Sequence, residues 1–131
     1  MSKNMFDMPF DEFANTVTQM AVKTTSSASR DFLGQLTGRA PVDTSRFVSN
    51  MNVSLDVPDN SHDNNKFIGE RGAYAAGAAV INVMRPNVLQ SVYIVNTISY
   101  GMDLETNRPS PKALEGTFYP SFLAVALYYA N

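Results

Sequence analysis

The sequence predicts a single α+β domain. In it, a small antiparallel or mixed β-sheet packs with a long N-terminal helix, a middle helix of small residues and a short C-terminal helix. Three patterns favour this class. Apolar side chains recur with helical spacing near the N-terminus, two apolar alternating stretches follow, and a helical segment rich in Gly and Ala separates them. The chain has 131 residues, which is enough for one domain with a core of its own.

Residues 7–36 are predicted to form the long helix. Its apolar face consists of Phe10, Phe13, Val17, Met20, Ala21, Ala28 and Phe32. Such a face usually packs in a core, so we interpret it as packing surface rather than as a ligand site. Pro9 suits a first helical turn, and Gly38 suits a helix end. The run TTSS at 24–27 has low helix propensity, so a kink or break there would be no surprise.

A turn and a strand are expected next. Pro41 restricts Ala40 to extended conformations, and Asp43 and Thr44 can accept hydrogen bonds from nearby backbone N–H groups. Residues 47–57 then alternate between apolar and polar side chains, which predicts a half-buried strand. Its two faces carry Val53, Leu55 and Val57 on one side and Asn52, Ser54 and Asp56 on the other.

Residues 58–66 form a polar segment that contains His62, the only histidine of the chain. Four side chains match the first, third, fifth and twelfth positions of a calcium-binding loop: Asp59, Ser61, Asp63 and Glu70. However, Asn64 stands where that loop needs Gly, Lys66 stands where it needs an aliphatic residue, and no helix leads into it. We therefore interpret the segment as a solvated turn and His62 as a surface histidine.

Three further elements complete the predicted core. Residues 67–84 have helical spacing, and the small residues at 72–79 should let this helix lie tightly on the sheet. Pro86 ends the helix. Residues 88–98 are predicted to form the central strand, apolar and buried on both faces. Residues 118–129 are predicted to be a short helix, with a strand as the alternative, packed on the core or on a neighbour.

The segment at about 100–117 is polar, contains two prolines and follows the predicted central strand directly. A compact domain rarely spends so many residues on an irregular excursion unless that excursion contacts something. We therefore predict an extended arm that reaches a neighbouring copy of the same protein. The side chains expected to make these contacts are Tyr100, Asp103, Glu105, Arg108, Lys112 and Glu115.

No catalytic, cofactor-binding or metal-binding residue is predicted. The chain has no cysteine, which removes thiolate ligands and cysteine nucleophiles. Ser61, His62 and Asp63 are adjacent in sequence, and three adjacent residues seldom orient as a catalytic triad. Asp103 and Glu105 stand near a turn without a cleft, so they are expected to be solvated or salt-bridged. We therefore expect a protein that is not an enzyme.

Charge and hydropathy narrow the classes of function that remain. The net charge of −2 argues against a protein that binds nucleic acid by electrostatic attraction. The longest uncharged apolar stretch, residues 118–130, is too short to span a bilayer and contains Pro120. The N-terminus carries acidic residues where a signal peptide has its apolar run. Synthesis in a cytoplasm, with no membrane partner, is the expectation.

Two sequence blocks resemble a known family. The first is RAPVDTSRF at 39–47, followed by SNM at 49–51; the second is YIVNTISY at 93–100, followed by LE at 104–105, SP at 110–111 and EG at 115–116. Together they resemble the stretches "sPVdTGrfrgNW" and "yivNnlpYa..lE.G.s..aP.G" of the tailed-bacteriophage neck, head–tail joining and tail-completion family. The resemblance covers residues 39–118, with both blocks in the family's order. Departures are Ser45 for Gly, Met51 for Trp, and the missing Gly after Glu105, where residues 106–108 (TNR) stand in its place.

The resemblance implies a structural virion protein, made in the host cytoplasm, that forms a hexameric or dodecameric ring at the head–tail junction. Its implied partners are copies of itself and adjacent neck, portal-adaptor and tail-tube proteins. Genome DNA would pass through the lumen without sequence-specific binding, which a mildly acidic subunit suits. The residues expected to fix the turn and strand start are Pro41, Asp43, Thr44, Arg46 and Asn50.

Two other functions compete with this one. The first is a non-enzymatic cytoplasmic binding or adaptor module, with a peptide or small ligand in a cleft between the small-residue helix and the sheet. The second is a minor hydrolase that uses His62 or the pair Asp103 and Glu105. A fold analogy cannot support an enzymatic claim without a site, so the hydrolase ranks last.

Overall fold

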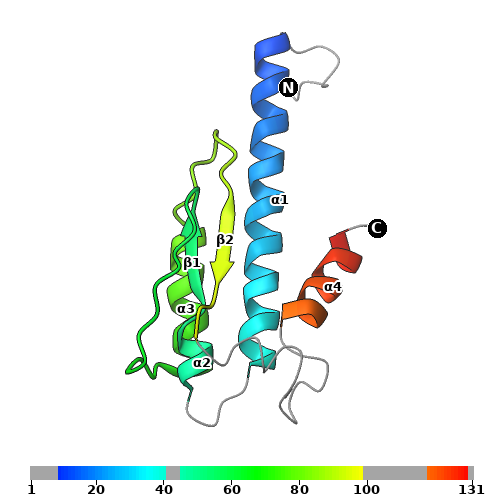
Figure 1. Ribbon diagram of the computed structural model, residues 1–131. Helices are drawn as coiled ribbons and strands as arrows, with labels where there is room; N and C mark the ends of the chain where they lie inside the picture. The colour runs from blue at the N-terminus through cyan, green and yellow to red at the C-terminus, as the bar shows by residue number, and fades with distance from the viewer. Residues whose placement is uncertain (1–8, 41–44, 99–117, 130–131) are drawn as a thin grey trace.

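The computed structural model describes residues 9–40, 45–98 and 118–129 (Figure 1). The elements in these ranges are α1 (Phe10–Arg39), α2 (Arg46–Ser49), β1 (Asn52–Leu55), α3 (Gly69–Ile81), β2 (Val92–Val95) and α4 (Phe118–Tyr129). Four helices and a two-stranded antiparallel sheet in the described ranges confirm the predicted α+β class. The predicted arm contacts at 100–115 and the motif residues Pro41, Asp43 and Thr44 lie outside the described residues.

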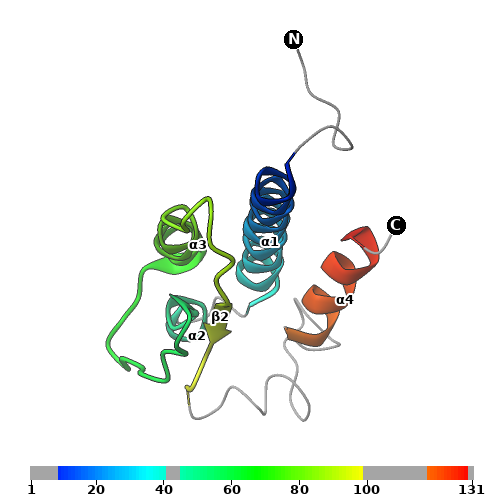
Figure 2. The same ribbon diagram turned by 90° about the horizontal axis from the view of Figure 1, so that it is seen from above.

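The elements form two layers. Figure 2 shows α1 between α3 and α4, with the sheet on one side of this row of helices. In the sheet Val53 lies opposite Ile94, and Leu55 lies opposite Val92. Directly opposed residues of antiparallel strands point to the same face, so these four apolar side chains share one face. That face lies against the helices, because Val53 approaches α3 and Ile94 packs on the core.

The core surrounds the C-terminal half of α1. Its fully buried side chains include Leu33, Leu36 and Ile81, and Phe47 and Ile98 pack beside them. The N-terminal turns of α1 extend beyond the other elements (Figure 1). There the side chain of Phe10 is 84% exposed and that of Met20 is 57% exposed. The prediction that the whole apolar face of this helix packs in the core was therefore wrong for its N-terminal half.

The long helix is continuous through the stretch of low helix propensity at 24–27. Residues 24–27 are helical, and the Arg30 guanidinium donates a 2.5 Å hydrogen bond to Ser26 Oγ one turn earlier. The helix runs through Gly38 and ends at Arg39, because Pro41 forces Ala40 into the extended conformation. Proline, rather than the glycine named from sequence, therefore terminates α1.

Both predicted strands are shorter than their alternating patterns. Residues 46–49 form the helical turn α2 instead of strand; Phe47 is buried within this turn, and Met51 is buried just after it. In the described residues β2 pairs with β1 alone, so it is not a central strand. Tyr93 is 37% exposed, which shows that the prediction of burial on both faces was wrong.

The close packing predicted for the small-residue helix is confirmed at Gly77. A Cβ atom added there would lie 2.5 Å from Leu33 Cδ2 of α1 and 2.7 Å from Val53 Cγ2 of β1. Both distances are below van der Waals contact, so only glycine fits between the two side chains. The place where the adaptor hypothesis put a ligand cleft is therefore filled by Leu33 and Val53 at this point.

Two glycine substitutions test this packing. Gly77→Ala should lower the free energy of unfolding by about 1 kcal/mol. Overpacking costs roughly 1–3 kcal/mol, and the higher helix propensity of alanine offsets up to about 1 kcal/mol of that cost. Gly34→Ala is the matched control on α1, because its added Cβ would lie 3.7 Å from Tyr74 Cε2, an ordinary contact. It should raise the free energy of unfolding by roughly 0.5–1 kcal/mol. Urea unfolding measures both, and equal signs would contradict the packing described.

Candidate functional site

Asn50 is the best-defined of the described motif residues. Its side chain is 1% exposed, and its Nδ2 donates to the carbonyl oxygens of Arg46 at 2.8 Å and Asp63 at 3.1 Å. Its Oδ1 accepts a 2.8 Å hydrogen bond from the backbone N–H of Asp63. The amide thus exchanges two hydrogen bonds with the backbone of one residue, Asp63, as a neighbouring strand would. The Asn50 side chain therefore both caps α2 and holds the polar loop at 58–66 in place.

Asn96, in the second block of the resemblance, also bonds backbone groups, on the other side of α2. Its Nδ2 donates a 2.7 Å hydrogen bond to the carbonyl oxygen of Phe47, and its Oδ1 accepts one of 3.1 Å from the N–H of Ile98. Ser49 Oγ accepts a 2.8 Å hydrogen bond from the N–H of Ile68. Side chains from both blocks therefore hold the same short helix, which brings the two blocks together in space.

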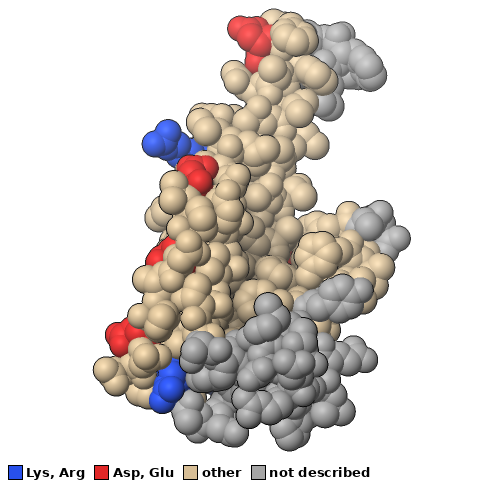
Figure 3. Space-filling view, in the orientation of Figure 1, with Lys and Arg blue, Asp and Glu red and all other residues tan. Residues whose placement is uncertain are grey.

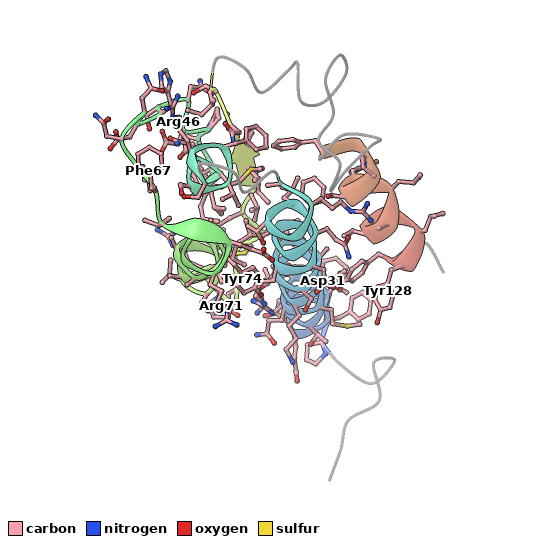
Figure 4. The ribbon with its side chains drawn as sticks, turned by 90° about the horizontal axis from the view of Figure 1, so that it is seen from below. Asp31, Arg46, Phe67, Arg71, Tyr74 and Tyr128 are labelled. Atoms are coloured by element: carbon pink, nitrogen blue, oxygen red, sulfur yellow. The ribbon has the colours of Figure 1, made fainter. Side chains whose placement is uncertain are left out.

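Arg46 lies on the outer side of this network. Its guanidinium carbon is 5.9 Å from the centroid of the Phe67 ring, and Figure 4 shows the two side chains next to each other. At this distance a cation–π attraction ties α2 to the segment before α3. Arg46 and Asn50 thus have structural roles in the described part of the chain.

The polar loop does not form a triad or a calcium site. Ser61 Oγ donates a 2.6 Å hydrogen bond to Asp59 Oδ1, and His62 Nδ1 lies 3.2 Å from Thr97 Oγ1. The hydrogen bonds from Ser61 hold the pKa of Asp59 below its usual value. Among the described residues no three His, Cys, Asp or Glu side chains are grouped so that they could hold a metal ion. Asp103 and Glu105 lie outside those ranges.

Removal of the Asn50 amide should loosen the loop. Asn50→Ala leaves the backbone groups of Arg46 and Asp63 without this partner, so a loss of about 2 kcal/mol in the free energy of unfolding is expected. Hydrogen exchange should show faster exchange at Asp63 N–H. Asn64→Ala, in the exposed part of the same loop, is the control and should change stability by less than about 0.5 kcal/mol. Equal effects of the two variants would contradict the role of Asn50.

Helix α4 is the most unusual surface element. None of its 12 residues is charged. Ser121 is fully buried, and the Phe122 ring meets Phe32 of α1 edge to face at 6.3 Å between centroids. Leu127 is 59% exposed and Tyr128 is 72% exposed. A helix that is apolar on all sides is normally covered on all sides, so the outer face of α4 has the character of an interface.

Grooves lie on both sides of α4. The first, of about 380 Å³, separates α4 from β2 above α1 and is lined by Ala28, Ser29, Phe32, Val92, Ile94, Phe122, Val125, Ala126 and Tyr129. The second, of about 470 Å³, is bordered by Asp31, Tyr74 and Tyr128, which Figure 4 labels. Helix α4 therefore rests on α1 along a narrow strip, with open space on either side.

The first groove, called here the β2–α4 groove, is almost entirely apolar. Ser29 Oγ and the Tyr129 hydroxyl are the polar side-chain groups in its lining. Figure 3 shows uncharged atoms across the front of α1, β2 and α4, while the charged side chains visible in this view lie along the opposite edge and at the top. The groove and the outer face of α4 thus form one continuous uncharged area.

A larger cleft of about 740 Å³ lies between α1 and the segment after α3. It is lined by Lys23 and Arg30 together with hydroxyl, amide and apolar side chains. The Arg30 guanidinium also donates a 3.2 Å hydrogen bond to Asn82 Oδ1, which holds this cation at the cleft wall. Its polarity distinguishes this cleft from the β2–α4 groove. The sequence patterns did not reveal it, because its residues come from two elements far apart in the chain.

Comparison with known proteins gives no match to a family model, to a curated protein or to a solved structure. Among the described helices, none combines the length and the apolar character needed to cross a bilayer.

The contact between α4 and α1 should depend on pH. The Tyr129 hydroxyl donates a 2.7 Å hydrogen bond to Asp31 Oδ2, and this bond raises the pKa of Tyr129 above its usual value of 10.0. The raised pKa means that the stabilisation is complete below pH 10 and is lost as pH rises through the higher folded-state value. Unfolding midpoints measured from pH 8 to about 11 should therefore fall less for Tyr129→Phe than for the unmodified protein. Tyr128→Phe, which keeps the Asp31 hydrogen bond, should retain the original profile.

Proposed function

We propose that this protein is a structural virion subunit that assembles with copies of itself into a ring at the head–tail junction of a tailed bacteriophage. The ring would act in the neck, in tail completion or in tail termination, and would join or stabilise the portal and the tail. The observation that carries the proposal is the uncharged helix α4, whose outer face exposes Leu123, Leu127 and Tyr128. Such a surface is typical of a subunit that is covered by another chain.

A second exposed apolar surface supports assembly in a ring. Phe10, Val17 and Met20 are exposed on the N-terminal half of α1, which projects away from α4 (Figure 1). Head-to-tail rings use two different surfaces of one subunit, so that each copy presents one surface to each neighbour. Two separate apolar surfaces on one small domain fit this requirement.

The hydrogen bonds of Asn50 and Asn96 support the family resemblance. Each amide fixes backbone groups around α2, so the blocks that carry the resemblance have a shared structural reason for their asparagines. The proposed partners follow from that family: a hexamer or dodecamer of this chain, adjacent neck and portal-adaptor proteins, and tail-tube proteins. The arm at about 100–117 remains part of the proposal and would contact the neighbouring subunit.

The alternative is a non-enzymatic cytoplasmic binding or adaptor module. The cleft between α1 and the segment after α3 favours it, because Lys23 and Arg30 line a space large enough for a small anionic ligand. A stable monomer that is absent from purified particles would support this alternative.

Electron microscopy of lysates from a parent phage that lacks this gene tests the first proposal. Full heads beside separate tails of normal length are expected for a joining protein, and overlong tail tubes are expected for a terminator. The unmodified phage, grown and imaged in parallel, is the control. Normal infectious particles in the absence of the gene would overturn the proposal and leave the adaptor module in its place.

Deletion of residues 106–112 tests the arm. The variant should remain a folded monomer, with unchanged circular dichroism and unfolding midpoint, because α1, α3 and the sheet are complete without these residues. It should fail to enter rings or virions, because the arm would no longer reach the neighbouring subunit. Size-exclusion chromatography and gel analysis of purified virions measure the two results. Normal incorporation would contradict the role of the arm.

A further inference from the structure

The sheet ends before the helical layer does. Helices α3, α1 and α4 lie in a row, but β1 and β2 cover only α3 and α1 (Figure 2). Within the described ranges the second edge of β2 pairs with no strand. The β2–α4 groove lies along this edge, at the position that the next strand of the sheet would occupy.

The groove has the chemistry of a strand-binding site. Val92 and Ile94 of β2 point into it on one face, Phe32 of α1 forms its floor, and Phe122 and Ala126 of α4 form its far wall. Phe122 is 59% exposed although its ring already contacts Phe32. An added strand lies roughly 4.8 Å from its neighbour, so a third strand beside β2 would cover these side chains. Its backbone would pair with the free edge of β2, as in strand addition between proteins.

We propose that residues 100–104 of a second copy of this chain add to β2 as the third strand. This inference rests on the function proposed above and identifies the site that receives the arm. The segment reads YGMDL, so Tyr100, Met102 and Leu104 alternate with Gly101 and Asp103. In a strand the three apolar side chains share one face. That face would fill the groove, while Asp103 would point toward water.

The path of the chain after β2 favours a second copy over the same copy. Ile98 is 4% exposed and packs in the core with Leu36 and Phe47, while Asn96 bonds both Phe47 and Ile98. The chain therefore continues beyond the end of β2 toward α2 (Figure 1) and away from α4 (Figure 2). It does not turn back at the end of β2 into its own groove.

The length of the following segment permits this exchange. Residues 99–117 separate the last described residue after β2 from the first residue of α4. At about 3.3 Å per residue, residues 100–104 can reach roughly 7–20 Å beyond Ile98, and residues 105–117 are then long enough to return to α4. The donor segment and the acceptor groove are different surfaces of one subunit. Repetition of the contact therefore gives a head-to-tail series that can close into a ring.

Cysteine cross-linking tests the inference sharply, because the natural chain contains no cysteine. The variant Ala126→Cys/Met102→Cys places one thiol in the groove and one in the donor segment. It is introduced into the phage, and purified virions are oxidised mildly and run on a denaturing gel without reductant. A ladder of covalent oligomers is expected, because each subunit would be linked to the next. Asn64→Cys/Met102→Cys, with the first thiol moved to the exposed polar loop, is the matched control and should give at least tenfold less product.

Each other outcome has a definite meaning. A covalent monomer closed within one chain would place the segment in its own groove and overturn the inference. Virions that contain the double variant but give no more product than the control would overturn the inference and leave the proposed function standing. Absence of the unmodified protein from virions would overturn the proposed function.

A mixing experiment with purified protein tests strand addition between copies separately from the proposed virion function. Ala126→Cys and Met102→Cys proteins carrying tags of different mass should form a heterodimer at least tenfold faster than Asn64→Cys and Met102→Cys proteins. Equal rates would contradict strand addition between copies, whatever the location of the protein in the virion. Ala126→Arg, which puts a charge in the groove, should abolish ring formation by the otherwise unmodified chain. Its unfolding midpoint checks that the subunit remains folded, and unchanged rings from the folded variant would contradict the inference.

Discussion

At Gly77 three elements of this protein meet with no room for a side chain. The contact places Leu33 of α1 and Val53 of β1 against the backbone of α3. This approach sets the separation of the two helices and brings the sheet down onto both of them. The position of β2, and hence the groove beside α4, depends on that separation. A constraint inside the core thus shapes the surface groove that lies beside it.

Much of the fold follows from local patterns, and the exceptions have physical causes. The C-terminal helix coincides with its predicted range, 118–129, and the alternation at Val53 and Leu55 identified the buried face of β1. The pattern from Phe47 to Met51 was interpreted as strand, but the side-chain amide of Asn50 donates a hydrogen bond to the carbonyl oxygen of Arg46 four residues earlier, and this local bond favours the helical turn. For β2, apolarity on both sides was taken as burial, although Tyr93 lies on a face that the helices leave uncovered.

The candidate site was less predictable than the fold. The motif singled out Arg46 and Asn50, and the structure shows their contacts with Phe67 and with the backbone of Asp63. The groove beside α4 and the cleft at Arg30 were missed, since each is formed by segments that are distant in sequence. For the groove, the sequence offered one indication: the uncharged composition of α4, which predicted that this helix packs on the core or on a neighbour. This composition did not show that β2 would form the opposite wall of the β2–α4 groove.

The N-terminal half of α1 projects as a single helix with apolar side chains exposed. An isolated helix gains little stability from its own backbone, so these turns should fray and re-form in the free subunit. A contact that covers Phe10 and Met20 would therefore order these helical turns when the contact forms. The free energy needed for this ordering would reduce the net free energy of binding. Subunits would then associate weakly in pairs and firmly only where several contacts form together. In the proposed ring, closure of the ring, rather than the first contact between two subunits, would then be the step that fixes a subunit in place.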